Sequence, residues 1–597
     1  MLKEILKIRN YADVRWRYFV TGIVFMILNA LLNGISIFSI GPLMDNIIAG
    51  KKVILPEKLP VYISMRLEPV VNFLNTLPPS SVLKYLIAFI IISIGLKGFF
   101  SYLNRYYFNL FGLHLLTDIR DRMYRKMATL SMDFFVYGKA GEITSRLIYD
   151  VNLLRGMFVA HLPGIIFQGT LAVVYLVIIF TIDWKMSLLA MLIFPPLLYP
   201  IYRTGRRLRK LGKKIQESHA KIGNLIYEGV YGQQIIKAYN QEEGIIKRFS
   251  DENKRIFRTV MACTKRIILI GPFTEIMSVI GASGLLYYGA KKVMEGSLSS
   301  GFLILFFVAL FSFISPLKSV GGDYVNIKQD SYALPRIFSF LDTKISVLDT
   351  GKEVFSGLRE GIEFQGVYFS YGKKEVLQDI TFSLKKGERL GIVGPTGVGK
   401  TSLIGLLLRF YEPEKGQLLI DGKDIRNYKL ETLREHIGFV PQEPILFNDT
   451  LKRNISLSEN PDMERVKKAA EIAGIKDFIE SLPDGYETIA GDRGMSFSGG
   501  QKQLISVARA IYRDPEIIIL DEATASLDSH SEKILQKAME RIMKGRTVFI
   551  IAHRLSTLRS VDRIIVLKEG RIVEQGTHEQ LVEKKGEYYH FWELQIH

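Results

Sequence analysis

Residues 390–401 read LGIVGPTGVGKT, and this stretch decides the fold of the second half of the chain. Four apolar residues predict a strand, a glycine-rich loop follows, and residues 402–409 suit a helix. Glycines let backbone N–H groups turn inward around an anion, to which the helix N-terminus adds partial positive charge. We therefore predict a nucleotide phosphate site formed by Gly394, Pro395, Thr396, Gly397, Val398, Gly399, Lys400, Thr401 and Ser402.

Within this loop, Lys400 can reach the β- and γ-phosphates, and the Thr401 hydroxyl can bind Mg²⁺. A second stretch, residues 517–522 (IIILDE), predicts a buried parallel strand that ends in two carboxylates. Phosphoryl transfer needs a carboxylate that holds the metal and a group that activates water. We assign Asp521 to the Mg²⁺ and Glu522 to the water, although a helix N-cap alone could explain one of the two acids.

The first half of the 597-residue chain has a different composition. Residues 1–349 carry 42 basic and 23 acidic side chains, a net charge of +19, whereas residues 350–597 carry −1. Because the basic half also holds the long apolar runs, a membrane protein fits the pI of about 9.5 better than a nucleic-acid-binding protein does. The single cysteine, Cys263, allows no intrachain disulfide.

Five apolar stretches predict six membrane spans. Residues 157–201 would make a helix of about 67 Å, twice the membrane thickness, so the polar break at residues 183–185 marks a hairpin. The apolar run after the basic N-terminus is too long for a signal-peptide core and should remain in the mature chain. The predicted spans are 19–40, 82–111, the two halves of 157–201, 267–288 and 298–319.

The distribution of lysine and arginine predicts the orientation. The segments 112–156 and 203–266 hold seven and sixteen of these residues, against four in 46–81. By the positive-inside rule, both termini and both long segments are cytoplasmic. The two segments are too long for structureless connections, and their apolar spacing suits helices that continue the spans. They could be simple solvated helices or could carry force to the second half of the chain.

Further motifs resemble those of ATP-binding-cassette (ABC) ATPases. Ser498, Gly499, Gly500 and Gln501 resemble the signature motif, with Phe497 in place of the usual leucine. Gln442 resembles the Q-loop glutamine, and Asp528 the D-loop aspartate. His553 resembles the switch histidine, and Tyr371 the aromatic residue that stacks on adenine. With the six spans before them, these motifs make the chain similar to ABC exporter half-transporters of type IV (subfamily B-like), including lipid A exporters and multidrug exporters.

The resemblance implies a six-span α-helical transmembrane domain (1–341), a linker (342–360) and an α/β P-loop nucleotide-binding domain (361–597). It implies a homodimer or close heterodimer in which ATP and Mg²⁺ lie between the P-loop of one chain and the signature of the other. Gln442 would contact the metal and couple the site to the membrane domain. Because Glu522, His553 and Ser498 are present, the site should hydrolyse ATP. Segments 141–150 and 228–241 match the family's coupling-helix regions.

Three basic residues are candidates for substrate binding: Lys97, Lys318 and Arg105. Charged residues inside spans are costly and mark functional sites, and Lys97 would lie about 22 Å along the second span. Together they could hold the phosphates of an anionic lipid taken from the inner leaflet, or they could extend to the head groups. Lys97 and Lys318 fall where lipid A exporters have basic residues, but Phe167 and Gln168 stand where a third is expected.

The sequence therefore predicts an ATP-driven exporter or flippase of an amphipathic lipid, such as lipid A or a lipopolysaccharide precursor, in the bacterial inner membrane. A multidrug or peptide exporter is the alternative. A gated channel or regulatory ABC protein could share the architecture, but the complete hydrolytic set favours a pump. Import is disfavoured, since importers usually keep the two domains on separate chains. The six spans exclude a soluble ATPase that acts on nucleic acid.

Overall fold

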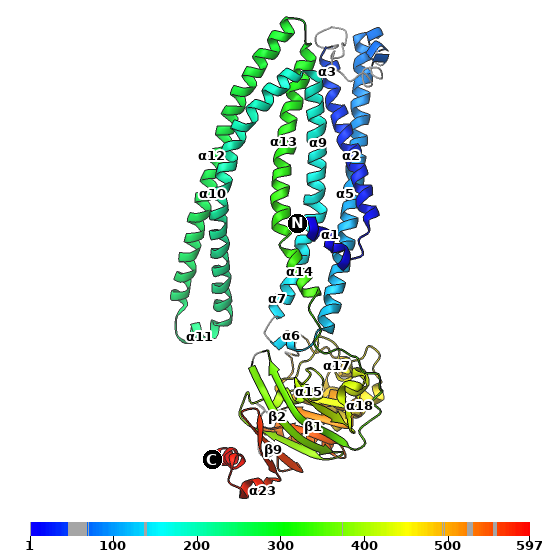
Figure 1. Cartoon of the computed structure of the whole chain (residues 1–597), viewed down its shortest axis with the longest axis vertical. Helices are drawn as coiled ribbons and strands as arrows, with labels where there is room; N and C mark the ends of the chain where they lie inside the picture. Colours follow the sequence, from blue (N-terminus) through cyan, green and yellow to red (C-terminus); the bar gives the residue numbers. More distant parts are fainter. Residues whose placement is uncertain are drawn as a thin grey trace. The chain divides into compact units, whose positions relative to one another are not determined.

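The computed structural model describes the backbone of residues 2–45, 68–69, 71–73, 75–136, 140–372, 374–491, 494, 496–521, 529–552 and 558–596 (Figure 1). The chain forms two compact units. The helical unit consists of residues 1–123 and 145–341, and the α/β unit of residues 124–144 and 342–597. The transmembrane helix that ends at Thr129 thus contributes its last residues to the α/β unit.

Long helices make up the helical unit, and two of the short elements that follow α7 (Ala140–Ser145) are π-helical. Its elements are α1 (Leu2–Tyr11), α2 (Trp16–Phe38), α3 (Ile40–Leu43), α5 (Pro79–Thr129) up to residue 123, η2 (Arg146–Asp150), α8 (Val151–Arg155), η3 (Gly156–His161), α9 (Leu162–Ile182), α10 (Trp184–Tyr231), α11 (Gln233–Ala238), α12 (Glu242–Met294), α13 (Ser300–Asp330) and α14 (Ala333–Leu341). All but the last residue of α7 belongs to the α/β unit. The π-helices are η2 and η3.

Side-chain caps begin two of these helices, α10 and α13. The predicted hairpin is confirmed at Asp183, which separates α9 from α10 and accepts a 2.8 Å hydrogen bond from the Met186 N–H. Lys292, near the end of α12, forms an ion pair with the same carboxylate. At the start of α13, Ser299 caps the Phe302 N–H, and buried Asp45 accepts from the Gly301 N–H at 2.7 Å.

The core of the helical unit lies where α9 packs along α13. Apolar residues at helical spacing on both helices meet there, and α2 covers the same seam. The residues are Leu171, Tyr175, Ile178, Phe302, Leu305, Phe306 and Ala309. Figure 1 shows α10 and α12 side by side, joined at one end by α11. The prediction that the long inner segments are helices is confirmed, because α5, α10 and α12 are continuous.

Within the described residues, four helical stretches are long and apolar enough to cross a membrane. They are Trp16–Phe38, Ser80–Thr129, Glu142–Ile182 and Ser300–Leu341. The two other predicted spans fall inside α10 and α12, so the count of six stays a prediction. The prediction of a helical transmembrane region is confirmed.

Two sheets form the α/β unit. The antiparallel sheet has the strand order β2-β1-β4-β5, and the larger sheet has the order β10-β9-β3-β8-β7-β6. All neighbours in the larger sheet are parallel except β10 and β9. The strands are β1 (Gly361–Tyr371), β2 (Lys374–Lys385), β3 (Arg389–Val393), β4 (Lys415–Ile420), β5 (Lys423–Asp424), β6 (Ile437–Val440), β7 (Ile517–Asp521), β8 (Thr547–Ile551), β9 (Arg563–Lys568) and β10 (Arg571–Gly576).

Helices cover the larger sheet, whose central strands are buried on both faces. Every residue of β7 and β8 is buried, as expected for the apolar runs of parallel strands. The helical elements are α6 (Asp133–Val136), α15 (Lys400–Leu407), η4 (Ile425–Asn427), α16 (Leu430–Glu435), α17 (Leu451–Ser456), α18 (Met463–Ile472), α19 (Lys476–Ser481), η5 (Gly485–Glu487), α20 (Gly499–Ile511), α21 (Ser529–Met543), α23 (His578–Glu583) and α24 (Glu587–Ile596).

Candidate functional site

The carboxyl edge of the larger sheet brings the predicted nucleotide motifs together. In the register of the parallel strands, Ile392 of β3 pairs with Ile551 of β8, and Ile551 pairs with Asp521 of β7. Since neighbouring strands lie about 4.8 Å apart, Asp521 is about 10 Å from the β3 strand end. Val440 of β6 pairs with Leu520, so Gln442 also follows at this edge. A crevice at the carboxyl ends of parallel strands is where α/β sheets bind ligands.

The glycine loop between β3 and α15 has the backbone geometry of an anion cradle. Gly397 and Gly399 have φ of +83° and +109°, a region that side chains disfavour. A Cβ at Gly399 would lie 2.6 Å from Leu377 Cδ2 and 3.1 Å from the Val376 carbonyl oxygen. The buried Lys400 amine donates to the carbonyl oxygens of Gly394 at 2.8 Å and Pro395 at 3.1 Å. The lysine is thus held over its own loop, where a phosphate would be bound.

Tyr371, the predicted adenine-stacking residue, ends β1 beside this loop. Its hydroxyl accepts a 3.2 Å hydrogen bond from Ser402 Oγ in the first turn of α15. Its ring meets Tyr411 edge to face, with the centroids 5.3 Å apart. Burial raises the pKa of Tyr411 above its ordinary value, and a hydrogen bond with Tyr371 and the charge of Asp133 act in the same direction. Tyr371 is therefore fixed next to the P-loop helix, and stacking on adenine stays a prediction.

The three predicted Mg²⁺ ligands differ in exposure in a way that fits a metal bound at the sheet edge. The Asp521 carboxylate is buried at the end of β7, only 5% exposed. Thr401 in α15 and Gln442 after β6 are exposed. A hydroxyl, an amide oxygen and a carboxylate are the oxygen ligands that Mg²⁺ prefers. The donor set fits the metal.

The signature residues form the N-terminus of α20. Ser498 Oγ accepts from the Gln501 N–H, and the Gln501 side chain accepts from the Ser498 N–H at 2.9 Å, which makes a capping box. Gly499 and Gly500 occupy the first helical turn, where N–H groups have no acceptor within the helix. Phe497, which departs from the family pattern, is buried against Phe478. Ser498 and Gly499 are exposed and Gly500 is buried, so an anion can approach this helix end from the side of Ser498 and Gly499.

Two residues that the sequence reasoning missed connect the signature helix to the Q-loop. The buried Gln503 side chain donates to the Pro441 carbonyl at 3.2 Å, one residue before Gln442. Arg509 donates to the carbonyls of Ile445 at 3.0 Å and Asn454 at 2.7 Å. Burial lowers the pKa of Arg509 to about 10. The sequence signal for these bonds was Arg509 itself, a charged residue among the apolar residues of α20.

Three of the predicted site residues, Glu522, Asp528 and His553, lie outside the described residues. Two of them directly follow, or nearly follow, strand residues that the structure describes. Glu522 directly follows Asp521, and His553 comes two residues after Ile551, the partner of Asp521 in β8. Their roles stay predictions.

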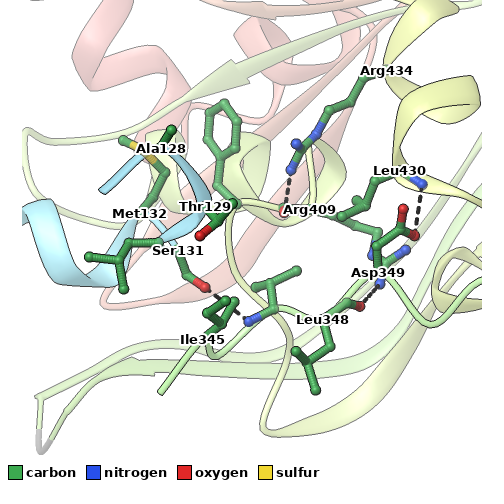
Figure 2. Close-up of a pocket in the computed structure, with 13 residues that line it drawn as sticks. Ala128, Thr129, Ser131, Met132, Ile345, Leu348, Asp349, Arg409, Leu430 and Arg434 are labelled. Carbon is green, nitrogen blue, oxygen red and sulfur yellow. Dashed lines mark hydrogen bonds between the residues drawn. The ribbon is translucent and has the colours of Figure 1, made fainter. Parts of the chain in front are cut away.

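The end of α5 packs into the α/β unit around a cavity of about 410 Å³ (Figure 2). Ser131, between α5 and α6, accepts a 3.0 Å hydrogen bond at Oγ from the Val347 N–H. Asp133 of α6 accepts from Ser346. On the opposite wall, the Arg434 guanidinium donates to the Arg409 carbonyl at 2.8 Å. All thirteen residues that line this cavity belong to the α/β unit.

The boundary between the two units bears on the coupling regions expected from the sequence. Residues 124–144 belong to the α/β unit and residues 145–150 to the helical unit, so the first expected region, 141–150, contains the boundary between the two units. Its coupling role stays a prediction. The second expected region contains α11 and exposes Ile235 and Tyr239.

The candidate substrate residues have different surroundings in the helical unit. Lys97 donates to Asn33 Oδ1 at 2.9 Å, and Asn33 donates to the Tyr175 hydroxyl at 3.1 Å. Lys97 is therefore engaged by α2 and does not simply extend to a head group. Lys318 of α13 and Arg105 of α5 are exposed. The uncharged Phe167 of α9 lines a cavity together with Arg105.

Comparisons with known proteins cover the whole chain. The family model described as ABC transporter transmembrane region matches residues 19–317, and the model described as ABC transporter matches residues 377–525. A solved bacterial Atm1-family ABC exporter with ATP bound is similar with a TM-score of 0.76 and 26% identity, covering 98% of this chain and 99% of that one.

Two curated relatives are both described as ATP-dependent lipid A-core flippase. The protein of Syntrophus aciditrophicus is 34% identical over 599 residues, which cover 100% of this chain and 94% of that protein. The protein of Desulfotalea psychrophila is 34% identical over 572 residues, covering 96% and 95%.

Proposed function

Because the chain belongs to the ABC transporter family, we propose that it is an ATP-driven exporter that moves lipid A or a related amphipathic lipid from the inner to the outer leaflet. The chain is an ATP hydrolase coupled to transport and binds nucleotide through its ABC domain. The observation that carries the proposed substrate is the likeness, over the full chain, to relatives described as lipid A-core flippases.

Each residue at the carboxyl edge of the larger sheet has its own role in ATP binding and hydrolysis. The P-loop N–H groups and Lys400 hold the phosphates, and Tyr371 positions Ser402 beside them. When bound through Thr401, Asp521 and Gln442, Mg²⁺ supplies positive charge at the phosphate oxygens. Glu522 orients the attacking water and accepts its proton, and His553 contacts the γ-phosphate. In a Glu522→Gln variant, ATP should bind but turnover should be lost; normal turnover would remove Glu522 from this role.

A second chain completes each nucleotide site in this proposal. The N–H groups at the start of α20 have no acceptor within the helix, so they can donate hydrogen bonds to the phosphates of an ATP held by the other chain's P-loop. A homodimer is the simplest arrangement, and Asp528 would lie at its interface. Closure of the two α/β units would act on the membrane helices through the joint at residues 124–144.

The chain is a multi-pass membrane protein, and we place it in the bacterial inner membrane with both termini in the cytoplasm. The excess of lysine and arginine in residues 112–156 and 203–266 supports this orientation. ATP is a cytoplasmic substrate, so the orientation puts the nucleotide site where its substrate is.

The basic residues of the helical unit support an anionic cargo. Lys318 is exposed on α13, and Lys97 lies partly buried on α5 with one hydrogen bond to Asn33. An exposed amine can pair with a lipid phosphate without losing a protein partner, whereas Lys97 must keep or exchange its bond. We therefore expect Lys318 to contribute more than Lys97 to lipid-dependent activity.

The test measures ATPase rates of the purified chain in phosphatidylcholine liposomes with and without lipid A. Lipid A should raise the rate, Lys318→Ala should reduce the increase, and Lys97→Ala with Lys318→Ala should abolish it. Lys84→Ala, an exposed lysine elsewhere on α5, is the matched control. If lipid A and the variants have no effect, the proposed cargo is wrong.

A drug or peptide exporter is the second candidate. The uncharged Phe167 and Gln168, where a third basic residue was expected, favour this alternative. Stimulation by cationic amphipathic drugs, in liposomes where lipid A has no effect, would decide for it.

A further inference from the structure

A cavity of about 280 Å³ lies inside the helical unit, between α2, α5 and the start of α9. Apolar side chains form one part of its wall, including Met26, Phe108 and Phe167. The other part is polar and consists of Asn29, Ser101, Asn104, Arg105 and Asn109. So many polar side chains in a helix bundle of a membrane protein indicate a function for the cavity.

Asn29 is the group that most needs a partner. Its side chain is only 3% exposed, and its Oδ1 accepts no hydrogen bond from any described residue. In a membrane, an unsatisfied buried polar atom is strongly unfavourable, because no bulk water can replace the missing donor. A ligand that donates an N–H or O–H group into the cavity would satisfy it.

Arg105 supplies positive charge at the same cavity. Its side chain is exposed, and it forms no ion pair within the described ranges. Asn109 donates to the Arg105 carbonyl at 2.9 Å, which ties the two residues to one turn of α5. A guanidinium that is open to one side binds phosphate groups well.

The wall formed by η3 has an unusual backbone. Val159 and Ala160 line the cavity and belong to the π-helical turn Gly156–His161. Such turns inside longer helices occur frequently at functional sites. Pro163 and Gly164, in the next turn, continue this wall with little side-chain volume.

We propose that this cavity binds the head group of an inner-leaflet glycerophospholipid, with the phosphate on Arg105 and an N–H or O–H donor of the head group on Asn29 Oδ1. The volume corresponds to about nine water molecules, which suits one small head group such as phosphoethanolamine. The exposed apolar side chains of Phe99 and Tyr102 on α5 offer a surface for the acyl chains. Arg105, which the sequence made a candidate for the cargo, is here assigned to a membrane phospholipid instead, and this assignment does not depend on the identity of the cargo.

Depth supports a head group of the cytoplasmic leaflet. Arg105 lies about 39 Å along α5 from Pro79, and the hydrocarbon core is about 30 Å thick. In the proposed orientation α5 enters from outside, so Arg105 lies at the cytoplasmic interface. Asn29 lies deeper, so the donor group would enter the bundle and the phosphate would stay near the interface.

The experiment is a lipid titration of the delipidated, purified full-length chain, followed by native mass spectrometry. Phosphatidylethanolamine should bind about tenfold or more tightly than phosphatidylcholine, because the trimethylammonium group has no N–H to donate. Asn29→Leu and Arg105→Gln should each remove most of this preference. Arg125→Gln, an exposed arginine further along α5, should leave it unchanged.

Three outcomes would overturn the inference. Equal binding of the two lipids by the unmodified chain would exclude a hydrogen bond from the head group to Asn29 Oδ1. This comparison does not depend on the folding of any variant. Unchanged binding by Arg105→Gln would exclude the phosphate contact, since this exposed side chain is not needed for folding. Displacement of phosphatidylethanolamine by lipid A or by inorganic phosphate at equal concentration would assign the cavity to the cargo or to a free anion.

Discussion

Alanine in place of Gly399 should impair nucleotide binding far more than the same change at Gly397 in the same loop. Both glycines have positive φ, so each substitution costs about 1–2 kcal/mol in backbone energy. At Gly397 a Cβ would meet nothing within 4 Å. At Gly399 it would lie 2.6 Å from Cδ2 of Leu377, which is 1% exposed and has no room to move. Overpacking of this kind costs roughly 2 kcal/mol more.

This difference is measurable as an ATP affinity. The loop can escape the overlap only by leaving the conformation that cradles phosphate, so the additional 2 kcal/mol corresponds to a roughly thirtyfold weaker Kd. A fluorescent ATP analogue, titrated into the purified chain without turnover, would measure it. Gly422→Ala, with φ of +76° and nothing within 4 Å, is a control outside the loop. Equal affinities for the Gly397 and Gly399 variants would refute the reasoning.

Three further predictions concern the α/β unit. Lys400→Met should abolish ATP binding in the same titration, because no other described side chain reaches over the loop carbonyls. Gln503→Leu should leave ATP affinity unchanged but lower turnover about five- to thirtyfold, since losing the bond to Pro441 loosens the Q-loop by about 1–2 kcal/mol. Gln417→Leu is the surface control. The Arg389 guanidinium holds the pKa of Asp562 below its ordinary value of 3.8. Asp562→Asn should therefore lower the thermal midpoint of unfolding at pH 7. The difference in midpoint between the variant and the unmodified chain should shrink as the pH falls below 3.8 and through the lowered pKa.

Local sequence signals were enough to predict the nucleotide edge. The run 390–401 contains its own strand, loop and helix start, and residues 517–521 are apolar because β7 is buried on both faces. The hairpin at Asp183 was predictable for a similar reason, since one polar break interrupts a run too long for a single span. In each case a short stretch of sequence carries the signal, even though the strands then pair with partners that are distant in sequence.

Contacts between distant residues were not predictable in this way. Arg509 contacts Ile445 and Asn454, and Lys97 contacts Asn33, across more than 50 residues in each case. Nothing near Ser131 in the sequence indicates a bond to Val347, so the assignment of residues 124–144 to the α/β unit needed the structure. The π-helical turn at η3 likewise depends on packing and has no simple sequence pattern.

The capping box at Ser498 gives the signature motif a physical meaning that its letters alone do not show. The box satisfies the N–H groups of Ser498 and Gln501, and the first helical turn leaves those of Gly499 and Gly500 without intrahelical acceptors. A side chain at Gly499 would narrow the approach of an anion to these two groups. The motif therefore works as a capped helix end whose Ser498 and Gly499 are exposed. Phe497 is buried against Phe478, so another apolar residue can take its place. Each chain thus offers one anion site in its P-loop and another at α20, and an ATP shared between two chains would use both.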